Sequence, residues 1–274
     1  METNICINCN NTFTGLYCNR CGQKVFTNKD KSIKGIAEEA FHFATHFEGK
    51  FFTTLQTVIS RPGKLSRDYC NGIRQRYYKP MSFFLMLIII YLLFPYMEGL
   101  NMRLEYYRGV VLTGDLITQQ IDNKLIESGL TENELGKIFR QKSEKIAKVL
   151  LLILIPLTAA ALHLLFFRRR KTAYDYMVLA TEINIFVLLV FFLIFPLLLA
   201  IAFTVANVQT MDESIFTPFM LVVFIAALMQ MFRSFFRESW LSLFIKSTLF
   251  LLLYFVISQI IYKSLLFELT FLLI

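Results

Sequence analysis

The chain has 274 residues, 56% of them hydrophobic, and its mean hydropathy is +0.54. Soluble domains are usually about 45–50% apolar, so this composition excludes an ordinary soluble domain and predicts an integral membrane protein. The net charge is +8, but much of the basic excess flanks apolar segments. That placement indicates membrane topology and contact with anionic lipid headgroups at the cytoplasmic face, rather than binding of nucleic acid.

Four of the five cysteines lie in two close pairs near the N-terminus. Cys6 and Cys9 form the first pair, and eight residues separate it from the second pair, Cys18 and Cys21. Four thiolates at this spacing make a tetrahedral zinc site when a short hairpin brings the pairs together. The β-branched and aromatic residues between the pairs suit such a hairpin. We therefore predict a small zinc ribbon over residues 1–28.

Four thiolates fill the coordination sphere of zinc, which leaves no position for water or substrate and makes the metal structural. A redox pair at Cys18 and Cys21 is the main alternative. The ribbon carries few basic residues, Arg20 and Lys24 among them, so we expect it to bind a protein partner. Two metal-binding pairs without disulfides also indicate a reducing, cytoplasmic location for the N-terminus.

Residues 29–79 are predicted to form amphipathic helices beside the membrane. In the stretch from Ile33 to Ser60, apolar residues such as Phe51, Leu55 and Ile59 recur every fourth residue, which is typical of one helical face. This helix either lies in the membrane interface or packs on the transmembrane helices; the pattern is compatible with both.

The same predicted helix carries Glu38, His42 and His46, which are spaced by four residues and so share one face. Two histidines and one glutamate can contribute to a metal site, but this ligand set is short of the usual four. A solvated polar stripe is the favoured interpretation.

Pro62 and Gly63 end this helix and redirect the chain. The segment that follows is basic and rich in tyrosine, and it leads directly into an apolar run, so we expect it to contact the lipid headgroups. The residues expected at this surface are Arg61, Lys64, Arg67, Tyr69, Arg74, Arg76, Tyr77 and Lys79.

Three motifs, followed by several spans, together resemble an uncharacterised family of bacterial inner-membrane proteins that carries a domain of unknown function. They are CxxCGQK at residues 18–24, RPG at residues 61–63 and YxxGxRxxYxxP at residues 69–80. The resemblance covers residues 6–95, and more weakly residues 168–186. It implies a cytoplasmic zinc ribbon joined to a helical membrane domain, and it carries no assigned activity.

The membrane domain is predicted over residues 80–274, with about five spans. Five apolar runs are long enough to cross a bilayer, and a sixth span stays open because the last eleven residues are apolar as well. The predicted spans are residues 80–96, 146–167, 178–206, 216–232 and 243–261. The fold class is therefore an all-α polytopic membrane protein with a small N-terminal zinc ribbon.

Basic residues before the first span and at residues 168–171 place those segments in the cytoplasm, and the resemblance implies that the membrane is the inner membrane of a bacterium. Residues 98–145 then form an extracytoplasmic loop, and an odd number of spans puts the C-terminus outside. That loop is predicted to hold a helix ending at Ser128, and a second helix opened by a capping box of Thr131 and Glu134.

Four polar residues lie near the cytoplasmic ends of the second and third predicted spans, and a polar group inside the membrane is costly unless it has a partner. They are His163, Asp175, Glu182 and Asn184. Counting residues from the intervening turn places His163 between Asp175 and Glu182 in depth, so the two helices could pair them. A pocket coupled to protons or ions is one interpretation, and a structural contact between helices is the favoured one.

These patterns predict a non-catalytic membrane protein whose cytoplasmic ribbon binds a partner and whose helices anchor or assemble a complex. The alternative is a small ion- or proton-coupled transporter or channel that uses His163, Asp175 and Glu182. An enzyme acting on lipid is the weakest of the three hypotheses, because the chain has three histidines and no nucleophile motif. Self-association of the chain stays open.

Overall fold

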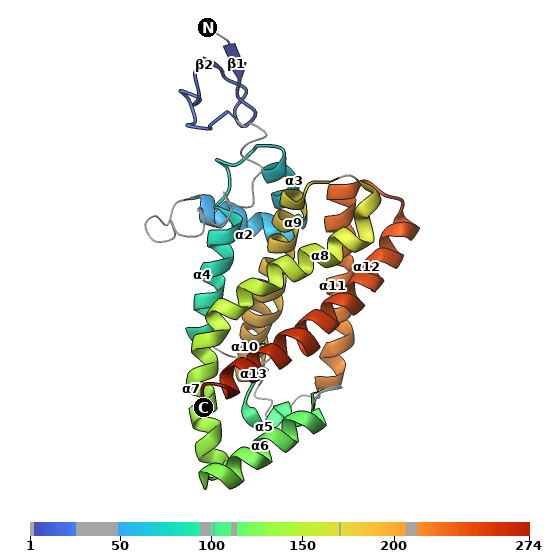
Figure 1. Ribbon diagram of the computed structural model, residues 1–274. Helices are drawn as coiled ribbons and strands as arrows, with labels where there is room; N and C mark the ends of the chain where they lie inside the picture. The colour runs from blue at the N-terminus through green and yellow to red at the C-terminus, as the bar shows by residue number, and fades with distance from the viewer. Residues whose placement is uncertain are drawn as a thin grey trace.

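The computed structural model describes residues 3–25, 49–93, 100, 102–110, 114–169, 171–206 and 213–274. A small β hairpin lies at one end, a bundle of long helices follows, and two shorter helices lie at the opposite end (Figure 1). The predicted metal ligands Glu38, His42 and His46, and the part of the predicted helix before Gly49, lie outside the described residues.

The N-terminal hairpin pairs β1 (Thr3–Ile5) with β2 (Thr12–Thr14) in antiparallel register, so that Asn4 faces Phe13. Phe13 is buried and packs against the cysteines, which together form a separate small core. So few apolar residues cannot stabilise a fold by themselves, which makes a bound metal the natural substitute for a hydrophobic core.

The described residues include four helices long and apolar enough to cross a membrane, which confirms the all-α polytopic fold. They are Glu132–Arg169, Ala173–Ala202, Pro218–Phe236 and Trp240–Phe271. The first predicted span, residues 80–96, corresponds to the shorter apolar helix α4 (Pro80–Leu93). Its 14 residues extend about 21 Å at 1.5 Å per residue, against a hydrocarbon core of about 30 Å.

The long helices are assembled from shorter segments. The elements are α7 (Glu132–Leu150), η2 (Leu151–Ile153), α8 (Leu154–Phe166), η3 (Phe167–Arg169), α9 (Ala173–Phe186), η4 (Val187–Ile194), α10 (Phe195–Ala206), α11 (Glu213–Phe236), α12 (Trp240–Phe255), η5 (Val256–Tyr262) and α13 (Lys263–Phe271). The tighter turn η2 and the wider turn η4 come just before Pro156 and Pro196. Each proline lacks an N–H donor and crowds the carbonyl four residues earlier, which accounts for these local changes of helical pitch.

Aromatic rings fill the centre of the bundle. Phe166 of α8 stacks on Phe236 of α11 with ring centroids 3.9 Å apart, and Phe232 meets Phe250 of α12 edge-on at 5.5 Å. Offset or edge-on aromatic pairs contribute roughly 0.5–1.5 kcal/mol beyond the area that they bury. Many of the 29 phenylalanines of the chain are thus used to pack helices together.

The end of the bundle opposite the ribbon has its own core. Helices α5 (Leu104–Tyr107) and α6 (Gly114–Ser128) pack with the start of α7 and the end of α13 around Tyr107, Phe139 and Phe267. The predicted capping box of Thr131 and Glu134 is present at the start of α7. The last residues of the chain continue the fifth predicted span as α13, so the C-terminal segment lengthens that helix and ends beside this core.

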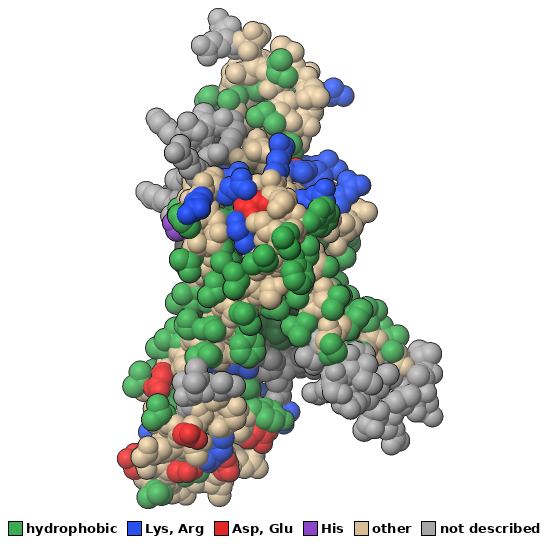
Figure 2. Space-filling view, turned by 90° about the vertical axis from the view of Figure 1, so that its right-hand side faces the viewer, with side chains coloured by type: hydrophobic (Ala, Val, Ile, Leu, Met, Phe, Trp, Pro, Cys, Tyr) green, Lys and Arg blue, Asp and Glu red, His purple; other side chains and the backbone are tan. Residues whose placement is uncertain are grey.

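Charge divides the two ends of the molecule. Figure 2 shows lysine and arginine gathered in a band between the apolar belt and the ribbon, while acidic residues gather mainly at the other end. Such an asymmetry is what the positive-inside rule produces across a membrane.

Candidate functional site

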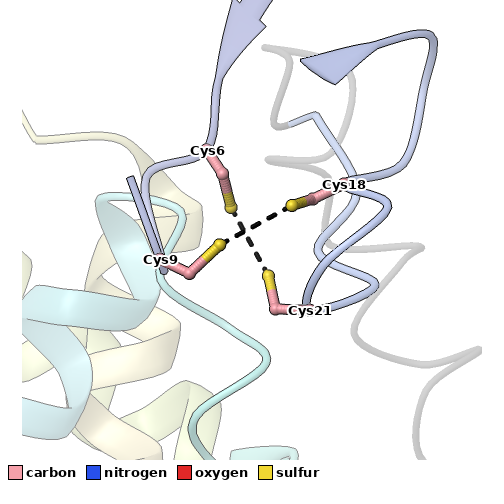
Figure 3. A group of neighbouring side chains, drawn as sticks. All are labelled: Cys6, Cys9, Cys18 and Cys21. Atoms are coloured by element: carbon pink, nitrogen blue, oxygen red, sulfur yellow. Dashed lines mark hydrogen bonds between the residues drawn. The ribbon is translucent and has the colours of Figure 1, made fainter. Parts of the chain in front are cut away.

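The four N-terminal cysteines point at a common centre (Figure 3). All four Sγ atoms lie within 4.8 Å of one another, with Cys6 to Cys21 at 3.5 Å and Cys9 to Cys18 at 3.6 Å. Four sulfur ligands at metal–sulfur distances of about 2.3 Å would be spaced by about 3.8 Å in a tetrahedron. Among the described residues, they are the one group of metal-ligating side chains close enough to share an ion.

The two cysteine pairs are built by the same turn. The N–H of Asn10 donates to the carbonyl of Cys6 at 2.8 Å, and the N–H of Gly22 donates to the carbonyl of Cys18 at 2.8 Å. Asn10 and Gly22 both adopt positive φ angles, of 56° and 70°, a conformation that asparagine and glycine tolerate better than other residues. The residue after each cysteine pair therefore allows its turn to close around a metal.

The thiols differ in how readily they ionise. Burial opposes ionisation of Cys18, but backbone N–H groups of Cys21 and Arg20 outweigh it and lower its pKa to about 6. The N–H of Asn11 favours the thiolate of Cys9, yet burial and the neighbouring cysteines raise its pKa to about 12. A bound cation removes this conflict because a coordinating thiol is deprotonated outright. The cluster could thus hold a metal ion, with four protein ligands and no open position.

Gln23 attaches the ribbon to the membrane domain. Its side chain is buried, and its Oε1 atom accepts hydrogen bonds from the N–H groups of Arg74 at 3.2 Å and Gln75 at 3.0 Å. The Gln75 side chain donates in return to the carbonyl of Gly22 at 3.0 Å. Sequence reasoning assigned Gln23 no role, although it lies in the CxxCGQK motif.

The segment that receives the ribbon is called the elbow here, residues 61–80. It joins α2 (Lys50–Ser60) to α4 and contains the short helix α3 (Lys64–Cys70). Gly63 is the N-cap residue of α3 and has a φ of +83°. A Cβ atom at this position would lie 2.5 Å from the Cα of Met231 in α11. Only glycine allows this contact, so the elbow lies directly against the bundle.

A buried carboxylate of α9 also binds the elbow. Glu182 of α9 is fully buried and accepts hydrogen bonds from the N–H groups of Gly63 at 2.8 Å and Ser66 at 2.7 Å, and from the Ser66 hydroxyl. These N–H groups lie at the start of α3, whose own N-cap residue supplies no side-chain acceptor. Glu182 therefore caps α3 from a distant helix, where the helix dipole also favours a negative charge.

The elbow tyrosines lie inside the protein rather than at the lipid surface, which corrects the expectation for Tyr69 and Tyr77. Tyr77 is 2% exposed and its hydroxyl donates to Asp68 at 2.7 Å. Tyr69 is 3% exposed, and the guanidinium of Arg74 lies 4.8 Å from its ring centroid. These side chains stabilise the turn that binds Gln23, because Arg74 also donates to Tyr174 of α9 at 2.5 Å.

The basic residues of the elbow divide into two groups. Lys64 and Arg67 are half-buried and pair with Asp68, at 2.6 Å and 3.4 Å. Burial opposes ionisation of Asp68, but hydrogen bonds from Lys64 and Tyr77 lower its pKa below the usual value. The exposed members, which remain available to a membrane surface, are Arg61, Arg76 and Lys79.

The predicted intramembrane polar cluster is not one cluster. Asp175 caps its own helix by accepting a hydrogen bond from the N–H of Thr172 at 3.0 Å. Asn184 joins three helices: it donates to Thr158 of α8 at 3.1 Å and accepts from Tyr254 of α12 at 3.0 Å.

His163 lies apart from these residues. It is exposed on α8, with its ring edge-on to Tyr176 at 5.2 Å, and the expected pairing with Asp175 or Glu182 does not occur. Glu182 and Asn184 thus bond to other helices, whereas Asp175 caps its own helix.

The elbow is also where the chain resembles known sequences. Residues 48–92 match a family of unknown function. Its model is described as a protein of unknown function (DUF3667), and the matched segment holds α2, the elbow and nearly all of α4. The resemblance to an uncharacterised family is thereby confirmed over this segment. No curated protein and no solved structure matches the chain.

Proposed function

We propose that this chain is a non-catalytic integral membrane protein that holds a zinc ribbon at the cytoplasmic face, where the ribbon binds a protein partner. One observation carries the proposal: an unbroken series of polar contacts links the ribbon to the bundle. Gln23 bonds the ribbon to the elbow, and Glu182 bonds the elbow to α9. A closed metal site that is fixed to a membrane helix suits binding and positioning rather than chemistry.

Zinc is the metal that we assign to the four cysteines, since a closed tetrahedral set of thiolates is the usual structural zinc site. Metal analysis of the purified protein should find one zinc per chain. Cys6→Ser should lose it, and Cys70→Ser, which alters the cysteine outside the cluster, should keep it. Iron in place of zinc, or equal loss in both variants, would overturn the assignment.

The partner surface is the apolar outside of the ribbon. Ile5, Leu16 and Tyr17 are 71%, 68% and 60% exposed, which is a large apolar area for so small a unit. A photo-crosslinking residue at Tyr17 should form one discrete protein adduct in cells, and Cys6→Ser should abolish it. The control is the same residue at Ile126 of α6, which is 82% exposed at the far end. Equal or absent adducts at both positions would refute the proposal.

We further propose that the ribbon faces the cytoplasm of a bacterium and that α6 faces the opposite side. The band of basic residues beside the ribbon supports this orientation (Figure 2). Reporter fusions after Lys124 should be active outside the cytoplasm and fusions after Lys171 inside it. The reverse pattern would overturn the orientation.

A further inference from the structure

A basic hollow opens at the end of the bundle that carries the elbow. Its volume is about 330 Å³, and Asn71, Ser234 and two phenylalanines form part of its wall. The charged residues that line it are Arg67, Arg169, Lys171 and Arg237. Among the described residues no acidic side chain lines it, and we call it the cation pocket.

The four cations come from three separate parts of the chain, because Arg169 and Lys171 lie two residues apart in one turn. Arg67 belongs to α3, Arg169 ends η3, Lys171 precedes α9 and Arg237 follows α11. Their convergence is therefore produced by the tertiary fold and is not the solvated face of a single helix. Bringing like charges together is unfavourable unless a counter-charge joins them.

Neighbouring carboxylates supply only part of that counter-charge. The ion pairs are Arg67–Asp68 at 3.4 Å, Lys64–Asp68 at 2.6 Å, Arg169–Glu238 at 2.9 Å and Lys246–Glu238 at 2.6 Å. Each carboxylate is thus shared by two cations. Lys171 and Arg237 have no carboxylate partner among the described residues, so the four cations that line the pocket have two neighbouring carboxylates between them, each also paired with a lysine outside the pocket.

Arg237 adopts a backbone conformation that is unusual for arginine. Its φ is +54°, at the position just after α11 where glycine or asparagine is the common residue. Glycine here would remove a steric cost, yet the chain places a long cation that lines the pocket. We take the arginine at this position as support for a role of its side chain in the pocket, because its backbone conformation alone would favour glycine.

The pocket lies at the basic end of the bundle, near exposed apolar side chains. The basic band of Figure 2 borders the apolar surface, and at this end of the bundle Leu164, Phe167 and Leu241 are 65%, 59% and 72% exposed. Trp240, beneath the guanidinium of Arg233 at 4.0 Å, is a residue type that favours the membrane interface. A phospholipid could thus place its phosphate in the pocket and its acyl chains along this apolar surface.

We propose that the cation pocket binds the phosphate of an anionic phospholipid from the adjoining leaflet. Arginine forms bidentate hydrogen bonds with phosphate and lysine adds a point charge, so three arginines and one lysine suit a headgroup. The site is distinct from the ribbon: it needs no metal and no protein partner. Headgroup binding would also join α3, α9 and α11 at the surface.

The test uses the full chain in zwitterionic detergent and measures retention of phosphatidylglycerol and phosphatidylcholine by native mass spectrometry. Phosphatidylglycerol should be retained at least tenfold more strongly. Arg237→Gly and Lys171→Gln should each reduce that preference at least fivefold. Lys137→Gln and Lys145→Gln, which remove exposed charges on α7 outside the pocket, should change it less than twofold.

Folding is separated from binding by Arg237→Gly, since glycine relieves the positive φ and should leave the unfolding temperature equal or higher. Arg237→Lys should retain most of the binding. Equal losses in the pocket and control variants would refute a defined site and indicate diffuse charge attraction. Full displacement of phosphatidylglycerol by inorganic phosphate at millimolar concentration would assign the pocket to a soluble phosphate and overturn the lipid proposal.

Discussion

The carboxylate of Glu182 accepts a hydrogen bond from the N–H of Gly63 at 2.8 Å, although 119 residues separate them in the chain. Glu182→Gln keeps the size of the side chain but turns an amide NH₂ group toward N–H donors. Hydrogen bonds to a buried charge contribute about 1.5–3 kcal/mol each, so we expect the free energy of unfolding to fall by about 3 kcal/mol. Unfolding in mixed detergent measures it.

The control for this change is Glu268→Gln. Glu268 is exposed and accepts from Gln120 at 3.1 Å, a bond that glutamine can also accept, so stability should change by less than about 0.5 kcal/mol. Equal stability of the two variants would show that Glu182 does not cap α3.

Gly63→Ala should destabilise the elbow for two reasons, a clash of the new Cβ atom and the strain of a positive φ at alanine. The new Cβ would meet the backbone of Met231 at 2.5 Å, and overpacking of this kind costs about 1–3 kcal/mol beyond the cost of positive φ. Gly129→Ala is the matched control, because Gly129 also has a positive φ but open space around it. Protease sensitivity of the elbow should rise in the first variant alone, and equal sensitivity would exclude the clash.

Asn184 and Tyr254 should be energetically coupled. Their hydrogen bond joins α9 to α12, and such bonds within membranes contribute about 0.6 kcal/mol on average. A double-mutant cycle with Asn184→Leu and Tyr254→Phe, followed by unfolding in detergent, should give a coupling of that size. Zero coupling would contradict a structural role for Asn184 and reopen the transport hypothesis.

Acid should weaken the turn between α11 and α12. Burial opposes ionisation of Glu238, but Lys246, Ser242 and Arg169 lower its pKa to about 2. Because the folded pKa is the lower one, its contribution is complete above about pH 4.5, the ordinary value. It is lost as the pH falls toward 2.

The measurement is the stability difference between the wild type and Glu238→Gln from pH 7 to pH 2.5. The difference should be largest at neutral pH and should shrink below about pH 4.5. Glu127→Gln, an exposed change on α6, should show no such trend. A difference that grew as the pH fell would mean that folding raises the pKa of Glu238 instead of lowering it.

The sequence predicted the features whose partners lie nearby in the chain. The spacing of Cys6, Cys9, Cys18 and Cys21 anticipated their convergence, since two turns and a hairpin suffice to bring them together. The capping box at Thr131 follows from a pattern of four residues. The spans follow from hydropathy, which depends on composition and not on which face of a helix points inward.

The long-range contacts of the elbow could not be predicted in the same way. Glu182 binds two backbone N–H groups, which every sequence provides, and the hydroxyl of Ser66, a side chain too common to signal the pair. A segment rich in tyrosine and arginine looks the same in sequence whether Tyr69 and Tyr77 face lipid headgroups or form an internal network. His163 lies on a helix that is apolar on nearly every side, so no amphipathic pattern indicated that it points outward.

The distance in sequence between Gly63 and Glu182 also sets an order of events during biosynthesis. Ribosomes add about 5–20 residues per second, so the 119 residues from Lys64 to Glu182 take roughly 6–24 s to appear. During that interval α3 has neither its cap nor the α11 surface beneath Gly63. The ribbon can close around its metal at once, but the elbow reaches its final position only after α9 and α11 have entered the membrane.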